Sequence, residues 1–523
     1  MTTTAGMADR QATAPTVRMA DVIASLALAT DLAEGQPLEH SLRRTLLAVW
    51  LGEELGLSQR DLSDAYYVAL LGSVGCVLDG SAFAGFVKDE IAVREEMAML
   101  DPSQPLKVAA FFLRHAGAGD PPLRRLTKLL SLGRQSQAIC RDVALHVGGL
   151  LDLGPAIKEA LGQCDEHWNG KGPVLGLKGE EIHLAARIFI LAQDVEVFNR
   201  LGGADAALTV VRKRAGKIYD PRIAERFSAV GAALLNRLQS ESAWDAVLSV
   251  EPAPPRLLSF AQFDEVACKV ANFIDMRSPY TVGHSPMVAS LAERAALALG
   301  VPASEAMALR HAGLLHDLGR AGAPVSFWNK TEPLSGEEWE RMKRHPSLTE
   351  IVLARSSSLG HLGTLAGLHH EKLDGSGYRG LSATSLPLTA RILAAADTYQ
   401  SKLEPRPHRE AMTPELAADE VRRQADHGKL DRDVVEALLS AAGHQPQRDK
   451  RPLPAGLSER EVEVLCLAVR GLSNRQIAEA LFLAPKTVGH HLENIYSKIG
   501  VSTRVGATLF AVQHGLIAEP IPS

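Results

Sequence analysis

Residues 283–301 read GHSPMVASLAERAALALGV, and residues 39–57 read EHSLRRTLLAVWLGEELGL. In both stretches the second and third residues are His-Ser, and the last three are leucine, glycine and an apolar residue. The register continues without a gap into RHAGLLHDLGR (310–320) and YYVALLGSVGC (66–76). Because such self-similarity indicates one structural unit used twice, the sequence predicts two tandem copies of a single fold.

Two later matches extend the repeat. DEHWNGKGPVLGL (165–177) is similar to HEKLDGSGYRGL (370–381), and ARIFILAQD (186–194) is similar to ARILAAADT (390–398). Runs of Ala, Leu, Arg and Glu fill the intervals, and long alternations of β-branched residues are missing. These features predict helices throughout, so we expect an all-α protein.

The length of 523 residues suggests about three domains, at roughly 100–200 residues per domain. Proline and glycine concentrate in EPAPP (251–255) and GHQPQRDKRPLPAG (443–456), which are typical of linkers. The predicted organisation is a flexible N-terminus at 1–17, a first copy at 18–250 (copy one), a second copy at 256–443 (copy two), a linker at 444–455 and a last domain at 456–520. The formal net charge of -5 argues against a polyanion-binding surface over the whole chain.

The composition also limits the compartment. The first residues carry no apolar signal-peptide core, and no run of about 18 uncharged apolar residues occurs. We therefore expect a cytoplasmic protein without a membrane span. Its five cysteines form no CxxC pair, so we expect reduced, buried thiols rather than a zinc cluster or a disulfide framework.

The two copies differ in the residues that carry chemistry. Copy two has His316-Asp317 where copy one has Gly72-Ser73, and His369-His370 where copy one has Cys164-Asp165. Asp397 aligns with Gln193, whereas His284 keeps its counterpart in His40. We expect copy one to be a degenerate domain that supplies a core, and with it a dimer surface or a regulatory pocket.

Copy two has the composition of a metal site, because seven of the 18 histidines fall within residues 284–370. Neutral imidazoles together with carboxylates suit iron, manganese or zinc. The adjacent pair His316-Asp317 could place an imidazole on one metal and bridge to a second through the carboxylate. Two metals about 3.5–4 Å apart can hold both the attacking and the leaving oxygen of a phosphoester.

Copy two contains, in this order, the motifs His284, HDLGR (316–320), RHP (344–346), HHEKLDGSGYRG (369–380) and RILAAADTY (391–399). Together they resemble the HD-GYP family of helical, metal-dependent phosphodiesterases that hydrolyse cyclic di-GMP. The resemblance implies iron or manganese, with zinc possible, on the ligands His284, His316, Asp317, His345, His369, His370 and Asp397, where Asp317 bridges. It also implies two ions, because the glutamate that commonly binds a third is replaced by Tyr280.

The same resemblance suggests the residues that act on substrate. Asp317 and Arg320 are the expected catalytic residues, and Arg320, Asp374, Gly377 and Tyr378 the expected substrate contacts. Arg320 stands where the family usually has lysine, and a guanidinium can hold a phosphate with two hydrogen bonds. The GYP triplet reads Gly377-Tyr378-Arg379, and Arg379 either attracts phosphate or faces water. Glu371, Asp374 and Gly375 match the motif and either cap the loop or contact ligand.

The last segment, residues 457–516, has four short helical stretches with serine N-caps at Ser458 and Ser473 and with Pro485 at a helix start. Ala484 precedes the helix that starts at Pro485, at a position where a serine N-cap is common, and the missing cap should cost that helix about 1 kcal/mol of stability. Two short helices joined by a tight turn indicate a helix-turn-helix. The segment resembles the LuxR/FixJ-type DNA-binding domain, which implies dimerisation through the last helix. It also implies DNA contacts at Arg475, Lys486, Thr487, Gly489, His490 and Lys498.

The sequence therefore predicts a homodimeric, DNA-binding transcriptional regulator that hydrolyses cyclic di-GMP with divalent metal. Two alternatives stay open. The protein could be a transcription factor whose HD domain senses a nucleotide without turnover, or its copy two could hydrolyse another phosphoester.

Overall fold

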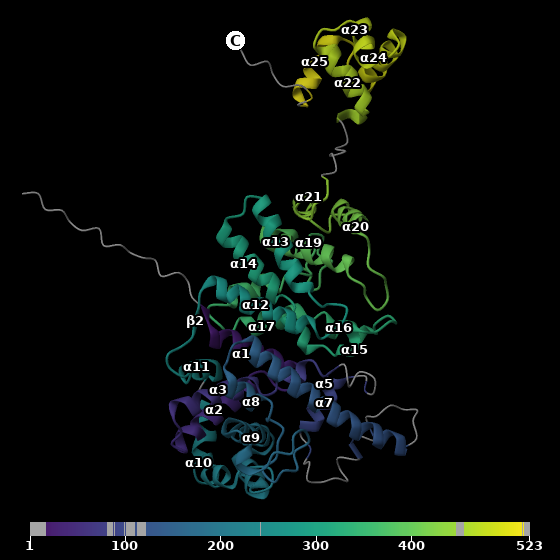
Figure 1. Cartoon of the computed structure of the whole chain (residues 1–523). Coiled ribbons are helices and arrows are strands. Elements are labelled where there is room, and N and C mark those ends of the chain that lie inside the picture. The colour runs from purple at the N-terminus through teal and green to yellow at the C-terminus, as the bar shows by residue number, and fades with distance from the viewer. Residues whose placement is uncertain are drawn as a thin grey trace, which may run out of the picture. The chain divides into compact units, whose positions relative to one another are not determined.

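The computed structural model describes residues 17–80, 87, 89–98, 100, 110–111, 114, 122–240, 242–445, 454–514 and 516 (Figure 1). The predictions about the N-terminus before residue 17, most of the linker and residues 517–520 lie outside these ranges. The chain divides into two compact units, Met1–Gln445 and Pro446–Ser523. Within the described ranges nearly all regular structure is helical, which confirms the predicted all-α fold.

Copy one contains a short strand, β1 (Val17–Arg18), followed by helices. They are α1 (Met19–Ala33), α2 (His40–Glu54), α3 (Gln59–Leu71), η1 (Val74–Val77), α5 (Glu90–Ala98), α7 (Pro122–Leu150), α8 (Pro155–Leu161), η2 (Gly179–Glu181), α9 (Leu184–Arg214), α10 (Pro221–Ser240) and α11 (Ala243–Ser249). Helix α9 is broken at Gly202 and Gly203, whose backbones are not helical.

Copy two also opens on a short strand, β2 (Leu257–Leu258). Its helices are α12 (Phe260–Asp275), α13 (His284–Ala298), α14 (Ala303–Leu315), η3 (Leu318–Gly322), α15 (Val325–Trp328), α16 (Gly336–Met342), α17 (His345–Leu353), α18 (Gly360–Ala366), η4 (Ala383–Ser385), α19 (Leu388–Leu403), α20 (Pro414–Asp426) and α21 (Arg432–Ala441).

The predicted repeat is confirmed down to single hydrogen bonds. Helices α2 and α13 both have 15 residues, and both begin at the aligned histidine after a residue with positive φ. At the start of α2, Asp31 accepts hydrogen bonds from the backbone N–H of Ser41 at 3.0 Å and from its hydroxyl at 2.6 Å. At the start of α13, Asp275 accepts the same two bonds from Ser285, both at 2.8 Å. The two copies therefore share one local architecture.

The copies pack against each other around α1. Fourteen of the residues of α1 are buried, and the helix contacts α2 and α3 in copy one as well as η3 and α17 in copy two. A single hydrophobic cluster runs from Met19 to Ala366 and so includes both copies. Strand β1 pairs with β2 in antiparallel register, Val17 with Leu258. Copies one and two thus form one compact unit, and the boundary at 251–255 stays a prediction.

The second unit is a four-helix domain, as predicted. After η5 (Pro454–Gly456) it contains α22 (Glu459–Val469), α23 (Asn474–Leu481), α24 (Pro485–Ile499) and α25 (Arg504–Gln513). Ser458 and Ser473 cap α22 and α23 through complete capping boxes. Ala484 offers no side-chain cap to α24, and Pro485 occupies its first turn. These findings agree with the sequence-based expectation at each helix start.

Candidate functional site

The His316-Asp317 pair lies at a turn that α17 holds in place. Helix α14 ends at Leu315, and η3 begins at Leu318. The hydroxyl of Thr349 accepts a bond from the N–H of Gly319 and donates one to the carbonyl of His316, each at 2.8 Å. A Cβ atom at Gly319 would lie 2.1 Å from the carbonyl oxygen of His345, so glycine is required for this close approach. The turn therefore brings His316 and Asp317 against the first residue of α17.

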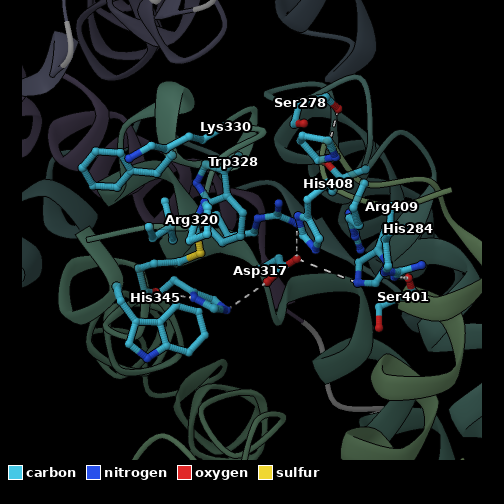
Figure 2. A pocket seen from close by; sticks show the side chains of 18 of the residues that line it. Ser278, His284, Asp317, Arg320, Trp328, Lys330, His345, Ser401, His408 and Arg409 are labelled. Carbon is cyan, nitrogen blue, oxygen red and sulfur yellow. Dashed lines mark hydrogen bonds and ion pairs between the residues drawn. The ribbon is translucent and has the colours of Figure 1, made fainter. Parts of the chain in front are cut away.

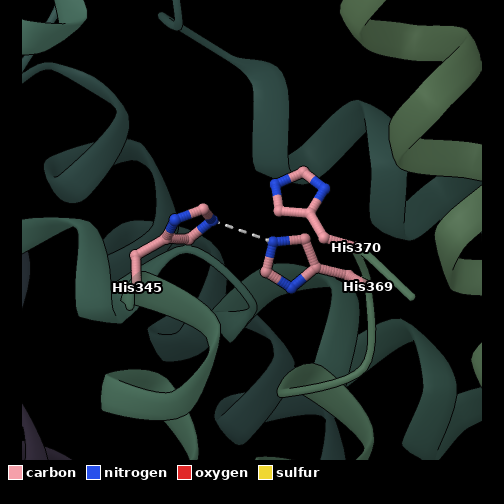
Figure 3. Close-up of side chains that lie close together, drawn as sticks. All are labelled: His345, His369 and His370. Carbon is pink, nitrogen blue, oxygen red and sulfur yellow. Dashed lines mark hydrogen bonds between the residues drawn. The ribbon is translucent and has the colours of Figure 1, made fainter. Parts of the chain in front are cut away.

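Three histidines of the cluster are oriented in the same way. In His316, His345 and His369 the Nδ1 atom lies 2.7 Å from a backbone carbonyl oxygen three residues earlier. A carbonyl only accepts, so Nδ1 carries the proton and the Nε2 lone pair is directed into the site. His345 and His369 face each other with their Nε2 atoms 3.1 Å apart (Figure 3). Nε2 of His316 is buried and has no hydrogen-bond partner among the described residues.

This arrangement fits a cation. Two lone pairs at 3.1 Å repel each other unless a proton or a metal lies between or beside them. Burial lowers the pKa of His345 to about 4, and burial with the neighbouring histidines holds the pKa of His369 well below its usual value. Both imidazoles are therefore favoured in the neutral form at neutral pH, and their Nε2 lone pairs are available to a metal ion.

Asp317 lies between two groups of histidines, as Figure 2 shows in part. Its Oδ1 atom is 3.5 Å from Nε2 of His345 and 3.7 Å from Nε2 of His369. Its Oδ2 atom is 3.6 Å from Nε2 of His316 and 3.9 Å from Nε2 of His284. Burial opposes ionisation of Asp317, but the positive charge of Arg320 and the neighbouring imidazoles outweigh burial and hold the pKa of Asp317 well below its usual value. One ionised carboxylate thus faces both groups.

Asp397 in α19 also contacts one histidine of each group. Its Oδ1 atom lies 3.2 Å from Nε2 of His284, and its Oδ2 atom 3.3 Å from Nδ1 of His370. Burial lowers the pKa of His370 to about 3. All seven residues that the sequence predicts as ligands therefore come together in one buried cluster.

Glu404 is a member of this site that the sequence analysis missed. Both of its carboxylate oxygens lie 3.0 Å from Nδ1 of His284. Burial opposes protonation of His284, but the hydrogen bonds that its ring donates to Asp397 and Glu404 outweigh burial and raise the pKa of His284 to about 10. The signal in the sequence was the helical spacing, because Glu404 follows Asp397 by two turns of α19.

A cavity of about 660 Å³ opens over the cluster. Its lining is rich in cations and aromatic rings, namely Arg320, Lys330, Arg406, His408, Arg409, Trp328, Trp339 and Tyr378 (Figure 2). The guanidinium of Arg320 lies 3.7 Å from the ring centroid of Trp328, and its NH1 donates to Asp317 at 2.7 Å. Stacking on the ring and the bond to Asp317 together fix Arg320 at the cavity floor.

The predicted substrate loop is shaped by Glu371. Its carboxylate accepts hydrogen bonds from the N–H of Arg379 at 2.8 Å and of Leu381 at 2.9 Å. A Cβ atom at Gly377 would lie 2.6 Å from Cα of Glu371, so this position requires glycine. Glu371 and Gly377 therefore set the path of the loop.

The other loop residues divide between cavity and surface. Tyr378 lines the cavity, whereas Asp374 is exposed and accepts bonds from the N–H and hydroxyl of Ser376 at 3.0 and 2.6 Å. These hydrogen bonds within the loop favour the interpretation of Asp374 as a loop cap over that of a ligand contact. Arg379 pairs with Glu350 of α17 at 2.6 Å.

Copy one fills the corresponding place with an arginine. The Arg44 side chain is buried, and its guanidinium donates to Ser73 at 2.9 Å and also to Gln193. Ser73 and Gln193 align with Asp317 and Asp397, respectively. A fixed side-chain cation therefore connects the positions that hold carboxylates in copy two.

The five cysteines are free thiols, as predicted, but only Cys140 and Cys164 are buried. The expectation that all five are buried is wrong, because Cys76, Cys268 and Cys466 lie at partly open positions of their helices. Cys76 and Cys140, which are far apart in the sequence, approach to 3.4 Å between their sulfur atoms. Asp79 beside them is paired with Arg94.

In the four-helix domain the predicted DNA contacts are exposed or half-exposed, and they differ in whether they have partners within the domain. Lys486, Thr487 and His490 are exposed on the first half of α24, and Gly489 is half-exposed. Arg475 is exposed on α23 and pairs with Glu479 at 3.3 Å. Nζ of Lys498, in contrast, lies 2.7 Å from Glu461 and 3.1 Å from the carbonyl of Gly456, so it already has partners within the domain.

Comparison with known proteins identifies both parts of the chain. The HD domain family matches residues 269–434, and the luxR family of bacterial regulatory proteins matches residues 455–511. A 3'3'-cGAMP-specific phosphodiesterase 3 of Vibrio cholerae is 28% identical over 443 residues, which cover 82% of this chain and 96% of that protein. A crystal structure of a cyclic GMP-AMP specific phosphodiesterase of V. cholerae superposes with a TM-score of 0.57 at 25% identity and covers 83% of this chain and 99% of that one.

Other relatives match a smaller share of the chain. The cyclic di-GMP phosphodiesterase response regulator RpfG of Xanthomonas campestris is 35% identical over 39% of this chain and 55% of its own length. A cyclic di-GMP phosphodiesterase of Thermotoga maritima is 34% identical over 34% of this chain and 50% of its own length.

The helical fold and its histidine-aspartate cluster thus define an HD-domain protein. The chain combines this HD domain, and a degenerate copy that precedes it, with a C-terminal helix-turn-helix domain of the LuxR type. Within the described residues, the helices lack a segment long and apolar enough to span a membrane.

Proposed function

We propose that this protein is a metal-dependent phosphodiesterase of cyclic dinucleotides and a DNA-binding regulator. The single observation that carries the enzymatic part is the position of Asp317, whose two oxygens face two separate groups of histidines at 3.5 to 3.9 Å. One carboxylate between two sets of nitrogen ligands is the arrangement that a two-metal phosphoesterase needs.

The residues would hold two ions. His284, His316 and Oδ2 of Asp317 would bind the first, and His345, His369, His370 and Oδ1 of Asp317 the second, with Asp397 between them. Nitrogen and carboxylate ligands without a thiolate favour iron or manganese, and zinc is the alternative. When bound, the ions supply Lewis acidity at the phosphoester and activate water as the nucleophile.

The side chains around the ions bind and orient the substrate. The guanidinium of Arg320 can donate two parallel hydrogen bonds to a phosphate. Tyr378 keeps its proton, because burial raises the pKa of its hydroxyl above the usual value, and it can donate a hydrogen bond to an anionic ligand. The ring of Trp339 is 41% exposed and lies 5.7 Å from the ring of Tyr378, which offers an aromatic surface for a base.

The size and charge of the cavity favour a cyclic dinucleotide over a simple phosphoester. Its volume of about 660 Å³ is in the range of sites for whole small-molecule ligands. A cyclic dinucleotide carries two phosphodiester anions, which match the cationic lining. Curated relatives act on 3'3'-cGAMP and on cyclic di-GMP, and we propose both as candidate substrates, with cyclic di-GMP as the first.

The LuxR-type domain supports DNA binding. Lys486, Thr487 and His490 are exposed at the start of α24, the helix that would enter the major groove. We propose that the protein binds DNA as a homodimer through α25 and that nucleotide in the HD domain alters its DNA affinity.

The test is hydrolysis by the full-length protein loaded with manganese or iron. The panel contains cyclic di-GMP, 3'3'-cGAMP, cyclic AMP and bis(p-nitrophenyl) phosphate. We expect linear dinucleotide product, and a chelator should abolish its formation. Turnover of the nitrophenyl ester or cyclic AMP alone would reject the proposed substrate class. Tight binding of a cyclic dinucleotide without product would identify a sensor instead of an enzyme.

A further inference from the structure

One wall of the cavity in copy two is a continuous segment that copy one touches at both ends. Residues 323–342 run from the end of η3 through α15 and α16, and they contribute Trp328, Lys330 and Trp339 to the cavity lining. Figure 1 shows α15 and α16 on the side of copy two nearest α5 of copy one. We call residues 323–342 the pocket wall.

The first contact is made by Glu90, the first residue of α5. Its Oε1 atom accepts a hydrogen bond of 2.6 Å from the N–H of Val325, and Glu90 is 1% exposed. Val325 is the first residue of α15, so its N–H has no acceptor within its own helix. A Cβ atom at Gly80 would lie 2.9 Å from Val325, and glycine therefore lets the two copies approach this closely. Copy one thus caps the helix that ends at Trp328.

A buried arginine, Arg277 of copy two, connects the two copies beside this contact. NH1 of Arg277 donates to the carbonyl of Val77 in copy one at 2.6 Å, and NH2 donates to the carbonyl of Ala323 in copy two at 3.0 Å. Ala323 directly follows η3, which carries Arg320. The start of the pocket wall is therefore bonded to copy one directly at Val325 and, through Arg277 of copy two, indirectly at Ala323.

The far end of the pocket wall is held by Asp89, the neighbour of Glu90. Asp89 forms an ion pair with Arg341 of α16. The guanidinium of Arg341 also lies 5.4 Å from the ring centroid of Phe327, which ties α16 to α15. Two adjacent acidic residues of copy one therefore fix both ends of the same wall.

From these contacts we infer that Asp89 and Glu90 are positioning residues for substrate binding, supplied by the copy that lacks the histidine cluster. They touch neither the histidine-aspartate cluster nor the cavity, and they act through Val325 and Arg341 on Trp328, against which Arg320 is stacked. Apart from His345, which follows the wall directly, the clustered histidines and aspartates lie on or beside α13, α14, α18 and α19. Loss of the contacts therefore weakens substrate affinity and leaves the chemical step intact. This inference rests on the proposed function, because it assigns a role at the same cavity.

The experiment compares Glu90→Ala, Glu90→Gln and Asp89→Asn with the wild-type full-length protein. Hydrogen exchange measured by mass spectrometry follows the amides of residues 323–342, and steady-state kinetics with cyclic di-GMP and 3'3'-cGAMP give kcat and KM. Glu53→Ala, which removes an exposed glutamate of α2, is the matched control. Metal content is measured in every sample.

We expect Glu90→Ala to accelerate exchange in the pocket wall and to raise KM about fivefold, the effect of one lost hydrogen bond, while kcat and metal content stay within twofold. Glu90→Gln should restore both values, because its amide oxygen still accepts from Val325. Asp89→Asn should accelerate exchange toward Arg341, and Glu53→Ala should change nothing. Unchanged exchange in Glu90→Ala, or a fall in kcat or metal content with unchanged KM, would overturn the inference. If the wild-type protein turns over neither nucleotide, the proposed enzymatic function fails. The role of Asp89 and Glu90 is then tested by hydrogen exchange in residues 323–342 and by the affinity of each variant for the nucleotide.

Discussion

The guanidinium of Arg44 donates a hydrogen bond of 2.9 Å to the hydroxyl of Ser73, which occupies in copy one the position of Asp317 in copy two. The same NH1 atom also binds Gln193, the counterpart of Asp397. Val288 occupies the position of Arg44 in copy two. Copy one therefore has an arginine bonded to a hydroxyl and an amide at the positions where copy two has two carboxylates.

Replacing Arg44 with valine, the residue of copy two, should destabilise the protein by about 3 kcal/mol, because Ser73 and Gln193 lose a buried donor. Thermal and urea unfolding of the full chain measure this change. Arg43→Val alters a half-buried neighbour on the same helix and should cost less than about 1 kcal/mol. Equal effects of the two substitutions would show that the guanidinium is not specifically required.

Aligned histidines should differ in their effect on metal content. His284→Ala should lower the affinity for manganese or iron by more than about 10-fold, because it removes an imidazole beside Asp317 and Asp397. His40→Ala removes the aligned histidine of copy one, which is bonded to Gln193 and Glu196, and should leave metal content unchanged. Elemental analysis of both proteins after equilibrium dialysis gives the comparison. A loss of metal in His40→Ala would place an ion in copy one.

Substitution of Asp317 by asparagine should reduce hydrolysis of cyclic dinucleotides by at least about 100-fold, because a neutral amide cannot bridge two cations. The helical fold should persist, as circular dichroism would show. Asp374→Asn makes the same chemical change at an exposed loop cap, and we expect its kcat/KM to fall less than about threefold. Normal turnover by Asp317→Asn at saturating metal would exclude this carboxylate from the reaction.

Metal binding should release a proton from His284. Burial lowers the pKa of His284, but the hydrogen bonds that its ring donates to Asp397 and Glu404 outweigh burial and raise this pKa to about 10, so the metal-free protein holds this proton at neutral pH. A metal ion competes with that proton, and the apparent metal affinity should therefore rise with pH from neutrality up to about pH 10. Calorimetry in buffers of different ionisation enthalpy counts the protons.

Glu404→Gln provides the matched control for proton release. It removes one of the two carboxylates that raise the pKa of His284, so fewer protons should be released at pH 8. An affinity that does not change between pH 6 and 9 in the wild-type protein would contradict this account of His284.

Two lysines of α24 should have separable roles. Lys486 is exposed at the start of the helix, and Lys486→Ala should weaken binding to duplex DNA and reduce the salt dependence by about one unit of slope. Lys498 is bound to the buried carboxylate of Glu461, so Lys498→Ala should lower the stability of the domain by about 1 kcal/mol. Fluorescence anisotropy at several salt concentrations and thermal unfolding separate the two effects. Loss of DNA affinity in Lys498→Ala without loss of stability would assign it to DNA.

The local features of the fold were predictable from the sequence. The aligned His-Ser pairs mark the first residues of α2 and α13, and Ser458 and Ser473 mark helix starts by their own side-chain bonds. The convergence of the seven histidines and aspartates was also predictable, because their motifs occur in the order of a known family. The helix starts were predictable because a cap is formed by residues close together in the sequence. The site was predictable because the resemblance to a known family covers all seven residues.

The remaining features depend on contacts between distant segments. Arg44 cannot be told apart from its neighbour Arg43 in the sequence, and its role appears only when the fold brings Ser73 and Gln193 to it. The bond between Glu90 and Val325 joins the two copies across 235 residues. The partner of Lys498 is Glu461 of α22, so this ion pair could not be predicted from the helix that carries Lys498.

The pairing of β1 with β2 has a consequence for the origin of the chain. Each strand leads into the helix whose aspartate, Asp31 or Asp275, caps the aligned His-Ser helix. Antiparallel pairing of the segments that precede two equivalent helices is a contact that a two-fold axis can generate, as in a symmetric homodimer. A gene duplication that fused the subunits of such an ancestral dimer would preserve this contact within one polypeptide. Selection for catalysis could then relax in one half, while its surface remained under selection as the partner of the other.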